Sequence, residues 1–506
     1  LVKLLIANRG EIAVRIIRAC REMDIETVAV YSEVDRLAPH VLMADQSFPI
    51  GPAAAAQSYL HVDRLLEVAA QSGAELLHPG YGFLAENADF AEKIEAAGVT
   101  WVGPPQEAMR VMGSKTESRK LAVQAGVPLI AGMMDPLESL AELESFVDEH
   151  GLPVLLKAVA GGGGKGMRAV SDRGELAGAY ERACSEGQAY FGDPRVYVEK
   201  LAVTPRHIEI QVVADKEGNA VYVGERECSI QRRHQKVVEE CPSPVVGPEL
   251  RERMGEAAMA IVKASGYHSV GTVEFLLDTE GEFFFLEMNT RLQVEHPVTE
   301  EVYGVDLVQE QIAIALGKPL SLRQEDLVPR GHAIECRVYA EDPLRDFAPS
   351  PGRITLYVRP GGPGVRLDSG VLAESVVPLE YDPMLAKLIV WAEDREGAIE
   401  RLDRALSEYQ VRGVSTTLTL FRALVGMDAF REARFHTGFL DELLASGDLK
   451  KLHGEQDPEA EAAAVMAAAC LATASASRLP GDLFDRGHES SWWFEGNRVL
   501  HGRFPR

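Results

Sequence analysis

The sequence predicts a chain of several domains, in which a parallel α/β region is followed by α+β structure. The length of 506 residues exceeds what one ordinary hydrophobic core supports and suggests roughly three domains. The chain begins with a strand, a turn, a helix and a second strand, which is the order of a parallel sheet. Residues 196–226 and 272–288 instead show the alternating pattern of antiparallel strands.

The N-terminal region is expected to form a Rossmann-like parallel sheet. Apolar strands at 2–7 and 27–31 flank a turn at 8–10 and a helix at 11–22, whose isoleucines fall on one side. A second unit follows, with a helix at 62–72, a strand at 74–77, a turn at 78–82 and an apolar segment at 101–105. The G-x-G-x-x-G dinucleotide fingerprint is absent, so this region gives no evidence for NAD.

The rest of the chain is expected to form two α+β regions and a tail. A helix follows Lys115, and further strands and helices are expected at 153–158, 176–189, 196–199, 207–214, 220–226, 249–265, 272–277 and 282–288. From about residue 320 prolines and glycines become frequent, and strands at 353–358 and 387–391 precede a helix at 395–409. Beyond residue 441 the chain is acidic and rich in alanine, with a helix expected at 462–477 and the beginning of a strand at 491–494.

The composition is typical of a globular enzyme and narrows the classes of partner. A net charge of −25 argues against nucleic acid as the main ligand, because phosphate backbones require a basic surface. Six cysteines without a CxxC pair predict neither a disulfide framework nor a zinc site. No signal peptide or membrane anchor is recognised, and Leu1 in place of Met suggests a processed or trimmed start. We therefore expect a cytoplasmic protein with reduced thiols.

The segment from Glu287 to His296 is the most informative part of the sequence. If it is extended, Glu287, Asn289, Arg291, Gln293 and Glu295 share one face. Carboxylate and amide oxygens suit a hard divalent cation, and the fork of an arginine suits a small anion. An exposed edge strand of mixed charge is the alternative. The apolar run at 283–286 favours a site, because it would carry the segment out of a core.

A glycine run and two lysines indicate a phosphate-binding site. Residues 161–166 contain four glycines before Lys165, so backbone amides could approach phosphate oxygens closely, although a flexible linker is the alternative. Lys157 ends an apolar strand and needs a negative partner, which could be a phosphate or a structural carboxylate. Lys115 stands at an expected helix start, where phosphate ligands are common but solvated lysines are commoner.

Two further groups of charged residues point to an anion and a metal. Residues 232–236 contain four cations when His234 is counted, which suits a small anion in so acidic a chain, although a basic surface patch is the alternative. Glu274 and Glu287 lie on neighbouring expected strands among apolar residues. Two such carboxylates repel each other unless a cation lies between them, so magnesium is expected there.

These motifs together resemble biotin carboxylase, a member of the ATP-grasp family, over about residues 2–440. The likeness is carried by residues 7–13, 78–84, 161–166, 231–240, 287–300 and 331–337. It implies a Rossmann-like (pre-ATP-grasp) domain at 1–112, an ATP-grasp domain at 113–320 with a mobile lid at about 130–203, and a C-terminal α+β domain at 321–441. Residues 442–506 resemble the start of the connecting region in acyl-CoA carboxylase alpha chains.

The resemblance also implies which residues form the site. ATP and Mg²⁺ (or Mn²⁺) are the expected cofactors, and the residues expected around ATP are Lys115, Lys157, Gly162, Gly163, Gly164, Glu199, Lys200, His207, Gln231, His234 and Leu276. The metal is expected on Glu274, Glu287 and Asn289. Bicarbonate is expected at Arg291, Gln293, Val294 and Lys236, and the catalytic residues are expected to be Glu295, Arg337, Arg291 and Lys236.

The implied reaction has two steps. ATP phosphorylates bicarbonate to carboxyphosphate, and the carboxyl group then passes to the ureido nitrogen of biotin. Bicarbonate is a poor nucleophile until its proton leaves, so Glu295 is expected to act as general base. Arg337 is expected to stabilise the enolate oxygen of biotin, while the closed lid protects the intermediate from water.

The expected partners are a biotin carboxyl carrier protein or domain, a carboxyltransferase subunit and a second copy of the chain. The sequence contains no Met-Lys pair for biotin attachment, so we expect the carrier on another polypeptide or a missing C-terminal portion. The favoured hypothesis is the first half-reaction of an acyl-CoA carboxylase. A pyruvate or urea carboxylase, a carbamoyl-phosphate-forming relative and a non-catalytic ATP-binding scaffold are the alternatives, and the sequence does not identify the acyl-CoA.

Overall fold

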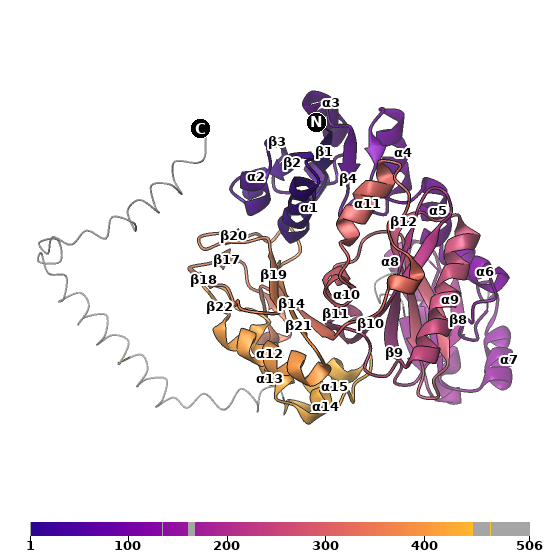
Figure 1. Ribbon diagram of the computed structural model, residues 1–506. Coiled ribbons are helices and arrows are strands. Elements are labelled where there is room, and N and C mark those ends of the chain that lie inside the picture. The colour runs from indigo at the N-terminus through magenta and orange to yellow at the C-terminus, as the bar shows by residue number, and fades with distance from the viewer. Residues whose placement is uncertain (1, 134, 160–166, 449–465, 467–506) are drawn as a thin grey trace, which may run out of the picture. The chain divides into compact units, whose positions relative to one another are not determined.

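The computed structural model describes residues 2–133, 135–159, 167–448 and Met466 (Figure 1). The chain divides into units at 1–449 and 450–506, and the described structure belongs to the first except for Met466. The glycine run at 161–166, the strand expected at 491–494 and, apart from the helical Met466, the helix expected at 462–477 lie outside the described residues. None of the helices in these ranges combines the length and apolar character needed to cross a bilayer.

Five parallel strands form the N-terminal sheet and confirm the Rossmann-like prediction. Their order is β3-β2-β1-β4-β5, with bounds β1 (Lys3–Ile6), β2 (Glu26–Ser32), β3 (Gln46–Gly51), β4 (Leu76–His78) and β5 (Thr100–Trp101). The accompanying helices are α1 (Gly10–Glu22), α2 (Pro39–Met43), α3 (Val62–Ser72), α4 (Ala88–Ala96) and α5 (Gln106–Gly113). Sequence analysis did not predict β3 or α4. Pro49 in β3 is compatible with its place at the sheet edge, where one ladder bond can be missing.

An eight-stranded antiparallel sheet forms the centre of the remaining structure. Its order is β13-β12-β9-β10-β11-β14-β21-β19. The bounds are β9 (Arg206–Ala214), β10 (Ala220–Arg232), β11 (Gln235–Cys241), β12 (Ser269–Leu277), β13 (Phe283–Asn289), β14 (His332–Tyr339), β19 (Val365–Ser369) and β21 (Met384–Ala392). Because β11 pairs with β14, the sheet runs without a break across the change in composition near residue 320.

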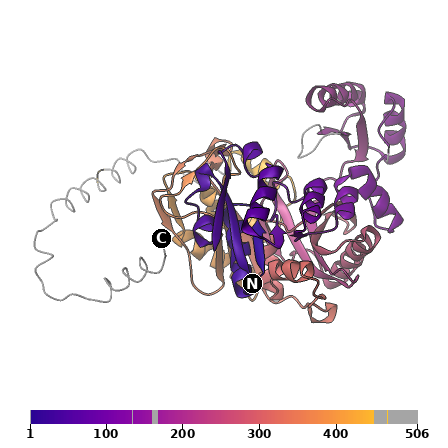
Figure 2. The same ribbon diagram turned by 90° about the horizontal axis from the view of Figure 1, so that it is seen from above.

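A smaller sheet forms the core of the region expected to be a lid. It contains β7 (Met167–Val170), β6 (Val154–Ala158) and β8 (Val196–Lys200) in that antiparallel order. Helices α7 (Leu140–His150) and α8 (Leu176–Phe191) pack on it around buried residues such as Phe146 and Leu156. Figure 2 shows this part, in purple, standing out from the larger sheet. It therefore has a hydrophobic core of its own.

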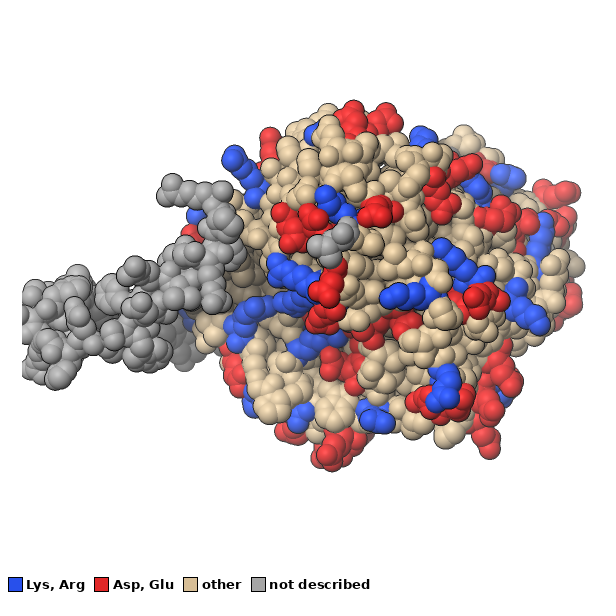
Figure 3. Space-filling view, turned by 45° about the horizontal axis from the view of Figure 1, so that its top comes forward, with Lys and Arg blue, Asp and Glu red and all other residues tan. Residues whose placement is uncertain are grey.

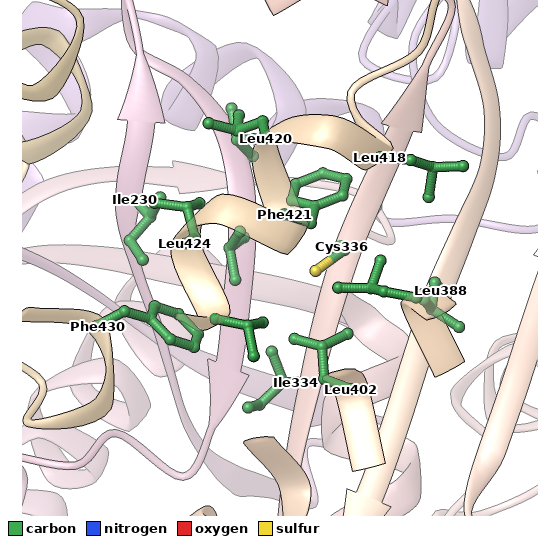
Figure 4. Close-up of a cluster of buried hydrophobic side chains, with 14 of the residues drawn as sticks. Ile230, Ile334, Cys336, Leu388, Leu402, Leu418, Leu420, Phe421, Leu424 and Phe430 are labelled. Atoms are coloured by element: carbon green, nitrogen blue, oxygen red, sulfur yellow. The ribbon is translucent and has the colours of Figure 1, made fainter. Parts of the chain in front are cut away.

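The two faces of β14 carry different kinds of side chain. Ile334, Cys336 and Val338 face a core formed with α12 (Arg395–Glu408), α13 (Leu418–Val425), α14 (Asp428–Arg431) and α15 (Phe439–Ser446) (Figure 4). Glu335 and Arg337 alternate with them and lie on the opposite face, because successive side chains of a strand point to opposite sides. That second face is covered by α10 (His296–Tyr303).

The remaining elements connect these layers. The longer ones are α6 (Lys115–Gln124), α9 (Pro248–Ser265) and α11 (Leu307–Ala315). Short strand pairs are β15 (Glu341–Asp342) with β16 (Ala348–Pro349), β17 (Gly352–Arg353) with β20 (Val376–Val377), and β18 (Leu356–Val358) with β22 (Gln410–Arg412). The strand expected at 353–358 is thus divided between β17 and β18, which pair with different partners.

Candidate active site

The polar segment 287–296 begins as a strand and ends as the start of a helix. Strand β13 ends at Asn289, and α10 begins at His296 with Glu295 as its N-cap and Pro297 in its first turn, a position that suits proline. The expectation that residues 287–295 share the face of one extended strand is therefore wrong beyond Asn289. A turn precedes the helix, closed by the bond from the His296 amide to the Gln293 carbonyl at 3.3 Å.

Side chains from this segment nevertheless converge on Glu274 in β12. One carboxylate oxygen of Glu274, Oε1, accepts hydrogen bonds from Asn289 Nδ2 at 2.7 Å and from Gln293 Nε2 at 2.8 Å. The same oxygen accepts from Lys236 Nζ at 2.9 Å. Lys236 comes from β11, so residues far apart in the sequence meet above one region of the eight-stranded sheet.

Lys236 is surrounded by carboxylates. Its ammonium lies 2.7 Å from Glu295 Oε1 and 2.9 Å from Glu274 Oε1, and it also bonds Glu209 Oε1. Burial alone lowers the pKa of Lys236, but the charges of Glu274 and Glu295 outweigh it and hold the pKa above its ordinary value. The lysine is therefore a permanent cation in the site.

Glu295 lies between two cations. Its Oε1 accepts from Lys236, and its Oε2 accepts from Arg337 Nη2 at 3.0 Å. Burial raises the pKa of Glu295. The charges of Lys236, Arg337 and Arg226 lower it by a larger amount, so the pKa lies well below its usual range. Arg337 is oriented by a second carboxylate, Glu239, which accepts from its Nε at 2.5 Å. Sequence analysis identified Glu295, Lys236 and Arg337 but not Glu239.

A histidine and three carboxylates lie beside this group. His207 Nε2 on β9 is 3.0 Å from Glu274 Oε2 and 3.3 Å from Glu209 Oε1, and the ligand atoms of these three residues lie within 4.8 Å of one another. Glu287 stands directly opposite Glu274 in the β12–β13 pair. The Glu287 side chain reaches solvent. Its pKa is nevertheless raised, first because the surrounding protein disfavours the charged form and then because of the negative charge of Glu274.

This donor set fits a hard divalent cation. Carboxylate oxygens are the ligands such ions prefer, and a cation between Glu274 and Glu287 would relieve their repulsion. The third expected ligand is less available, because Asn289 Oδ1 accepts from Arg291 Nη2 at 2.9 Å and its Nδ2 donates to Glu274. Glu209, which the sequence analysis missed, adds a further carboxylate beside the same place.

Arg226 supports the site from within the sheet. It is completely buried in β10 and donates to Glu209 Oε2 at 3.1 and 3.2 Å. Its other hydrogen bonds go to Gln211 at 2.6 Å, Thr299 at 3.0 Å, Thr272 at 3.1 Å and Gln293 at 2.5 Å. In the sequence Arg226 stands between Glu225 and Glu227 in an expected strand, and this local pattern does not show that its partners lie on other strands.

The lid brings together the residues expected near adenine and phosphate. Glu199 on β8 bonds Lys157 Nζ from β6 and Arg119 Nη1 from α6, the latter at 2.7 Å. The structural carboxylate that was one alternative for Lys157 is therefore present. Burial, and next the charge of Lys157, lower the pKa of Lys115. An anion bound beside these two lysines would reduce the repulsion between their positive charges.

Two other residues expected near ATP lie nearby. Lys200 donates to the carbonyl of Leu152 at 2.8 Å, so its side chain is held against the segment that precedes β6. Leu276 on β12 stands opposite His207 on β9, so the strand pair links the expected adenine and phosphate contacts. Gly162, Gly163 and Gly164 lie outside the described residues.

The basic cluster at 232–236 is only partly available to an anion. Arg232 Nη2 and Arg233 Nη2 pair with Asp346 at 2.7 and 3.0 Å. His234 is exposed at the tip of the β10–β11 hairpin. Gln231 is buried near the end of β10, where it stands opposite Lys236. On the face shown in Figure 3, acidic and basic side chains are likewise interspersed rather than separated.

The remaining residues expected at bicarbonate lie beside Asn289 and before α10. Arg291 Nε pairs with Glu86 at 3.1 Å, and its Nη1 donates to the Leu292 carbonyl at 3.2 Å. The backbone carbonyl of Val294 accepts from Lys387 Nζ at 2.7 Å. Lys387 is almost completely buried and was not predicted to contribute. It fixes the backbone on which the expected anion site depends.

Glu240 links β11 to the helical layer and makes stability depend on pH. It accepts from His332 Nε2 at 2.8 Å and from Arg395 Nε at 2.7 Å. Burial opposes ionisation, but these hydrogen bonds lower the pKa of Glu240 from 4.5 to about 2. The carboxylate therefore stabilises the fold above pH 4.5, and this contribution is lost as the pH falls toward 2.

We expect wild-type protein to lose about 3 kcal/mol more unfolding free energy than Glu240→Gln between pH 5 and pH 2, because a glutamine cannot titrate. Urea unfolding at several pH values would measure this difference. Glu432→Gln is the control, since the exposed pair of Glu432 with Arg434 should contribute little. Equal pH slopes for wild type and Glu240→Gln would contradict the assignment.

Comparisons with known proteins agree with this arrangement. Residues 1–109 match the biotin carboxylase N-terminal domain, 114–323 match the ATP-binding domain of the carbamoyl-phosphate synthase L chain, and 335–442 match the biotin carboxylase C-terminal domain. The chain is 54% identical over 440 residues to a pyruvate carboxylase subunit from Methanothermobacter thermautotrophicus, covering 87% of this chain and 89% of that one. It is 52% identical over 440 residues to biotin carboxylase 1 of Bacillus subtilis, covering 87% and 98%.

A solved structure shows the same fold. The biotin carboxylase domain dimer of Hydrogenobacter thermophilus 2-oxoglutarate carboxylase, in complex with MgADP, ADP and bicarbonate, superposes with a TM-score of 0.82 at 46% identity. The match covers 87% of this chain and 97% of the other. With all three domains matched and identities above one half, the chain belongs to the biotin carboxylase family of ATP-grasp ligases.

Proposed function

We propose that this chain carboxylates carrier-bound biotin with bicarbonate and ATP, as the first half-reaction of an acyl-CoA carboxylase. The placement of Glu295 between Lys236 and Arg337 carries the proposal. An ionised carboxylate in that position can receive the proton of bicarbonate, while the two cations can hold anionic oxygens on either side. Relatives solved as complexes with MgADP and bicarbonate, or as a beta-gamma-ATP complex, support the same ligands here.

Glu295 acts as the general base in this proposal. In the described structure its low pKa makes it a weak base, because Lys236 and Arg337 both donate to it. An incoming anion competes for the same cations, so substrate binding would release Glu295 and raise its basicity. The base is thereby activated only when its substrate is present.

The other residues bind and orient the substrates. Bicarbonate lies against Arg291, Gln293 and the Val294 backbone, with Lys236 on its other side. The ATP phosphates are held by Lys115, Lys157, His207 and His234 with Gln231 and by the backbone amides of glycines 162–164. Glu199, Lys200 and Leu276 surround the adenine.

Magnesium or manganese would be held by Glu274 and Glu287, with Asn289 after its amide turns away from Arg291. Bound there, the ion would neutralise phosphate charge and orient the phosphoryl group. Arg337 would stabilise the enolate oxygen of biotin once its hydrogen bond to Glu295 opens.

The partners follow from the half-reaction. Biotin arrives on a carboxyl carrier protein or domain, a carboxyltransferase passes the carboxyl group to the acceptor, and a homodimer is proposed from the dimeric relative. An acyl-CoA acceptor is supported by the resemblance of residues 442–506 to the start of the connecting region in acyl-CoA carboxylase alpha chains. Pyruvate is the second candidate, because a relative of 54% identity is a pyruvate carboxylase subunit.

The first test of this function is ATP cleavage that requires bicarbonate and magnesium and is stimulated by free biotin. Arg337→Ala should abolish the stimulation by biotin, whereas Arg345→Ala, which removes an exposed arginine, should leave it intact. Folded protein that binds ATP without bicarbonate-dependent turnover would support the non-catalytic scaffold. Dependence on ammonia in place of biotin would support a carbamoyl-phosphate-forming enzyme.

A second measurement identifies the acceptor. The native complex would be purified with its carboxyltransferase and supplied with labelled bicarbonate, ATP and carrier. Label in an acyl-CoA supports the proposal. Label in pyruvate or 2-oxoglutarate, with no label in any acyl-CoA, would refute the acyl-CoA assignment without affecting the half-reaction.

A further inference from the structure

Two buried glutamates face each other beneath the candidate site. Glu239 on β11 and Glu335 on β14 are direct partners in an antiparallel pair, so their side chains lie on one face with Cβ atoms about 4.5–5.5 Å apart. Both residues are completely excluded from solvent. Arg337 follows Glu335 on the same face, and its Nε donates to Glu239 Oε1. The pair therefore adjoins the guanidinium proposed to act on biotin.

Most of the oxygens of this pair lack a donor. Among the described residues, Glu239 Oε2 and both carboxylate oxygens of Glu335 have no hydrogen-bond partner. The neighbouring cations are directed elsewhere: Arg337 Nη2 donates to Glu295 at 3.0 Å, and Lys387 Nζ donates to the Val294 carbonyl at 2.7 Å. Buried polar groups are rarely left in this condition.

One proton shared by Glu239 and Glu335 would supply a missing hydrogen bond and remove the repulsion between two negative charges. A buried carboxylate without donors is strongly unfavourable, and two facing carboxylates repel each other, so one of them takes a proton. Burial first, and then the charge of Glu239 against the opposing charge of Lys387, hold the pKa of Glu335 well above its ordinary value. Burial also raises the pKa of Glu239, but Arg337 opposes that rise. The proton therefore belongs on Glu335.

We propose that Glu335 is a neutral carboxylic acid that donates its proton to Glu239 Oε2 and thereby serves as a positioning residue for Arg337. With Oε2 occupied by that donor, the ionised Glu239 presents Oε1 to Arg337 Nε. Glu335 itself touches no substrate. The inference rests on the proposed role of Arg337 in biotin carboxylation, although the protonation of Glu335 does not.

The charged surroundings allow one competing arrangement. The charged groups around the pair are Arg337 on β14, Lys387 on β21 and Glu295 before α10. The Tyr81 phenol is not available to the pair as a donor, because it donates to Glu11. In the competing arrangement Glu335 is ionised and serves as a counter-ion for Lys387. The two arrangements differ in the charge of Glu335, so a neutral isostere distinguishes them.

Infrared spectroscopy in D₂O at neutral pH tests the proton directly. Wild-type protein should show the carbonyl band of a protonated carboxylic acid, and that band should be missing from Glu335→Gln. Absence of the band from wild type, or its persistence in Glu335→Gln, would overturn the proposal. This result does not depend on turnover, so failure of the proposed function would leave it interpretable.

Kinetics tests the positioning role. Glu335→Leu leaves Glu239 Oε2 without a donor, and biotin carboxylation should fall about tenfold, because a lost buried hydrogen bond of this kind costs a comparable factor. Biotin-independent ATP cleavage with bicarbonate should change less, whereas a purely structural defect would lower both. The conservative Glu335→Gln, whose amide can still donate to Glu239, should restore most of the lost biotin carboxylation.

Loss of biotin carboxylation in Glu335→Gln equal to that in Glu335→Leu would overturn the neutral-acid assignment and favour the counter-ion. If Glu335→Leu does not fold, the pH dependence of stability in Glu335→Gln provides the second measurement. A raised pKa makes the wild-type contribution complete at low pH and lost as the pH rises through it, so wild type should lose more unfolding free energy than Glu335→Gln on going from pH 5 to pH 9. Equal slopes would count against a buried proton.

Discussion

Glu295→Gln should lower kcat for bicarbonate-dependent ATP cleavage by about 10²–10⁴-fold, the usual contribution of a general base. The glutamine keeps the shape, but its single carbonyl oxygen can accept from only one of Lys236 and Arg337, and it cannot take the proton of bicarbonate. The Kd for ATP should change little, because Glu295 lies at the bicarbonate end of the site. Steady-state kinetics with and without biotin, together with nucleotide titration, would measure both quantities.

Glu301→Gln is a suitable control for this experiment. Glu301 lies on α10 a short way after Glu295 and pairs with Arg366 at 3.2 Å, away from Lys236. Its replacement should leave kcat close to the wild-type value. A folded Glu295→Gln protein with undiminished kcat would exclude Glu295 as the base, and would direct attention to Glu274 or Glu209, which contact the same lysine.

Arg226→Met should lower the unfolding free energy by about 3–5 kcal/mol, which is typical when one partner of a buried ion pair is removed. Methionine fills much of the same space but removes the guanidinium that donates to Glu209 Oε2, so this buried carboxylate keeps Lys236 as its neighbouring cation. The hydrogen bonds to Gln211, Thr272, Thr299 and Gln293 are lost as well. Urea unfolding monitored by circular dichroism would measure the change.

Two further variants define the origin of this effect. Arg226→Lys keeps the charge but cannot reach the separate acceptors of a planar fork, so its loss of stability should be smaller than that of Arg226→Met without vanishing. Arg253→Met removes an exposed arginine paired with Glu282 at 3.3 Å and should cost at most about 1 kcal/mol. An Arg226→Met protein as stable as Arg253→Met would show that the buried network is dispensable.

Local sequence patterns predicted many of the longer elements of the fold, but not β11, β14 or the helices α10, α11 and α13–α15. The helix expected at 62–72 has the bounds of α3, and the apolar run at 2–7 contains β1. Strand β3 was not predicted because its large apolar residues are only Phe48 and Ile50 and because Pro49 stands between them. The continuous sheet could not be predicted, since pairing of β11 with β14 joins segments separated by nearly a hundred residues.

The candidate site was predictable where its residues stand together in motifs. Glu295 lies in the polar segment 287–296, Glu274 is a lone carboxylate in an apolar strand, and Arg337 lies in a segment of the family resemblance; the structure brings all three to one place. Glu209 and Glu239 stand within strands buried on both faces, and it is strand pairing that places Glu209 near Lys236 and Glu239 near Arg337. Only the long-range pairing of strands reveals that such charges meet partners.

Hydrogen bonds between β11 and β14 fix Lys236 and Arg337 on adjacent strands. Adjacent strands keep a spacing of about 4.8 Å, so in the proposed reaction Lys236 beside bicarbonate and Arg337 beside biotin would stay at a fixed separation. A chimera joining two relatives near residue 320 must preserve this pairing, or its substrates would meet out of alignment. Any exchange of the segments on either side of this seam would therefore have to keep β11 and β14 paired.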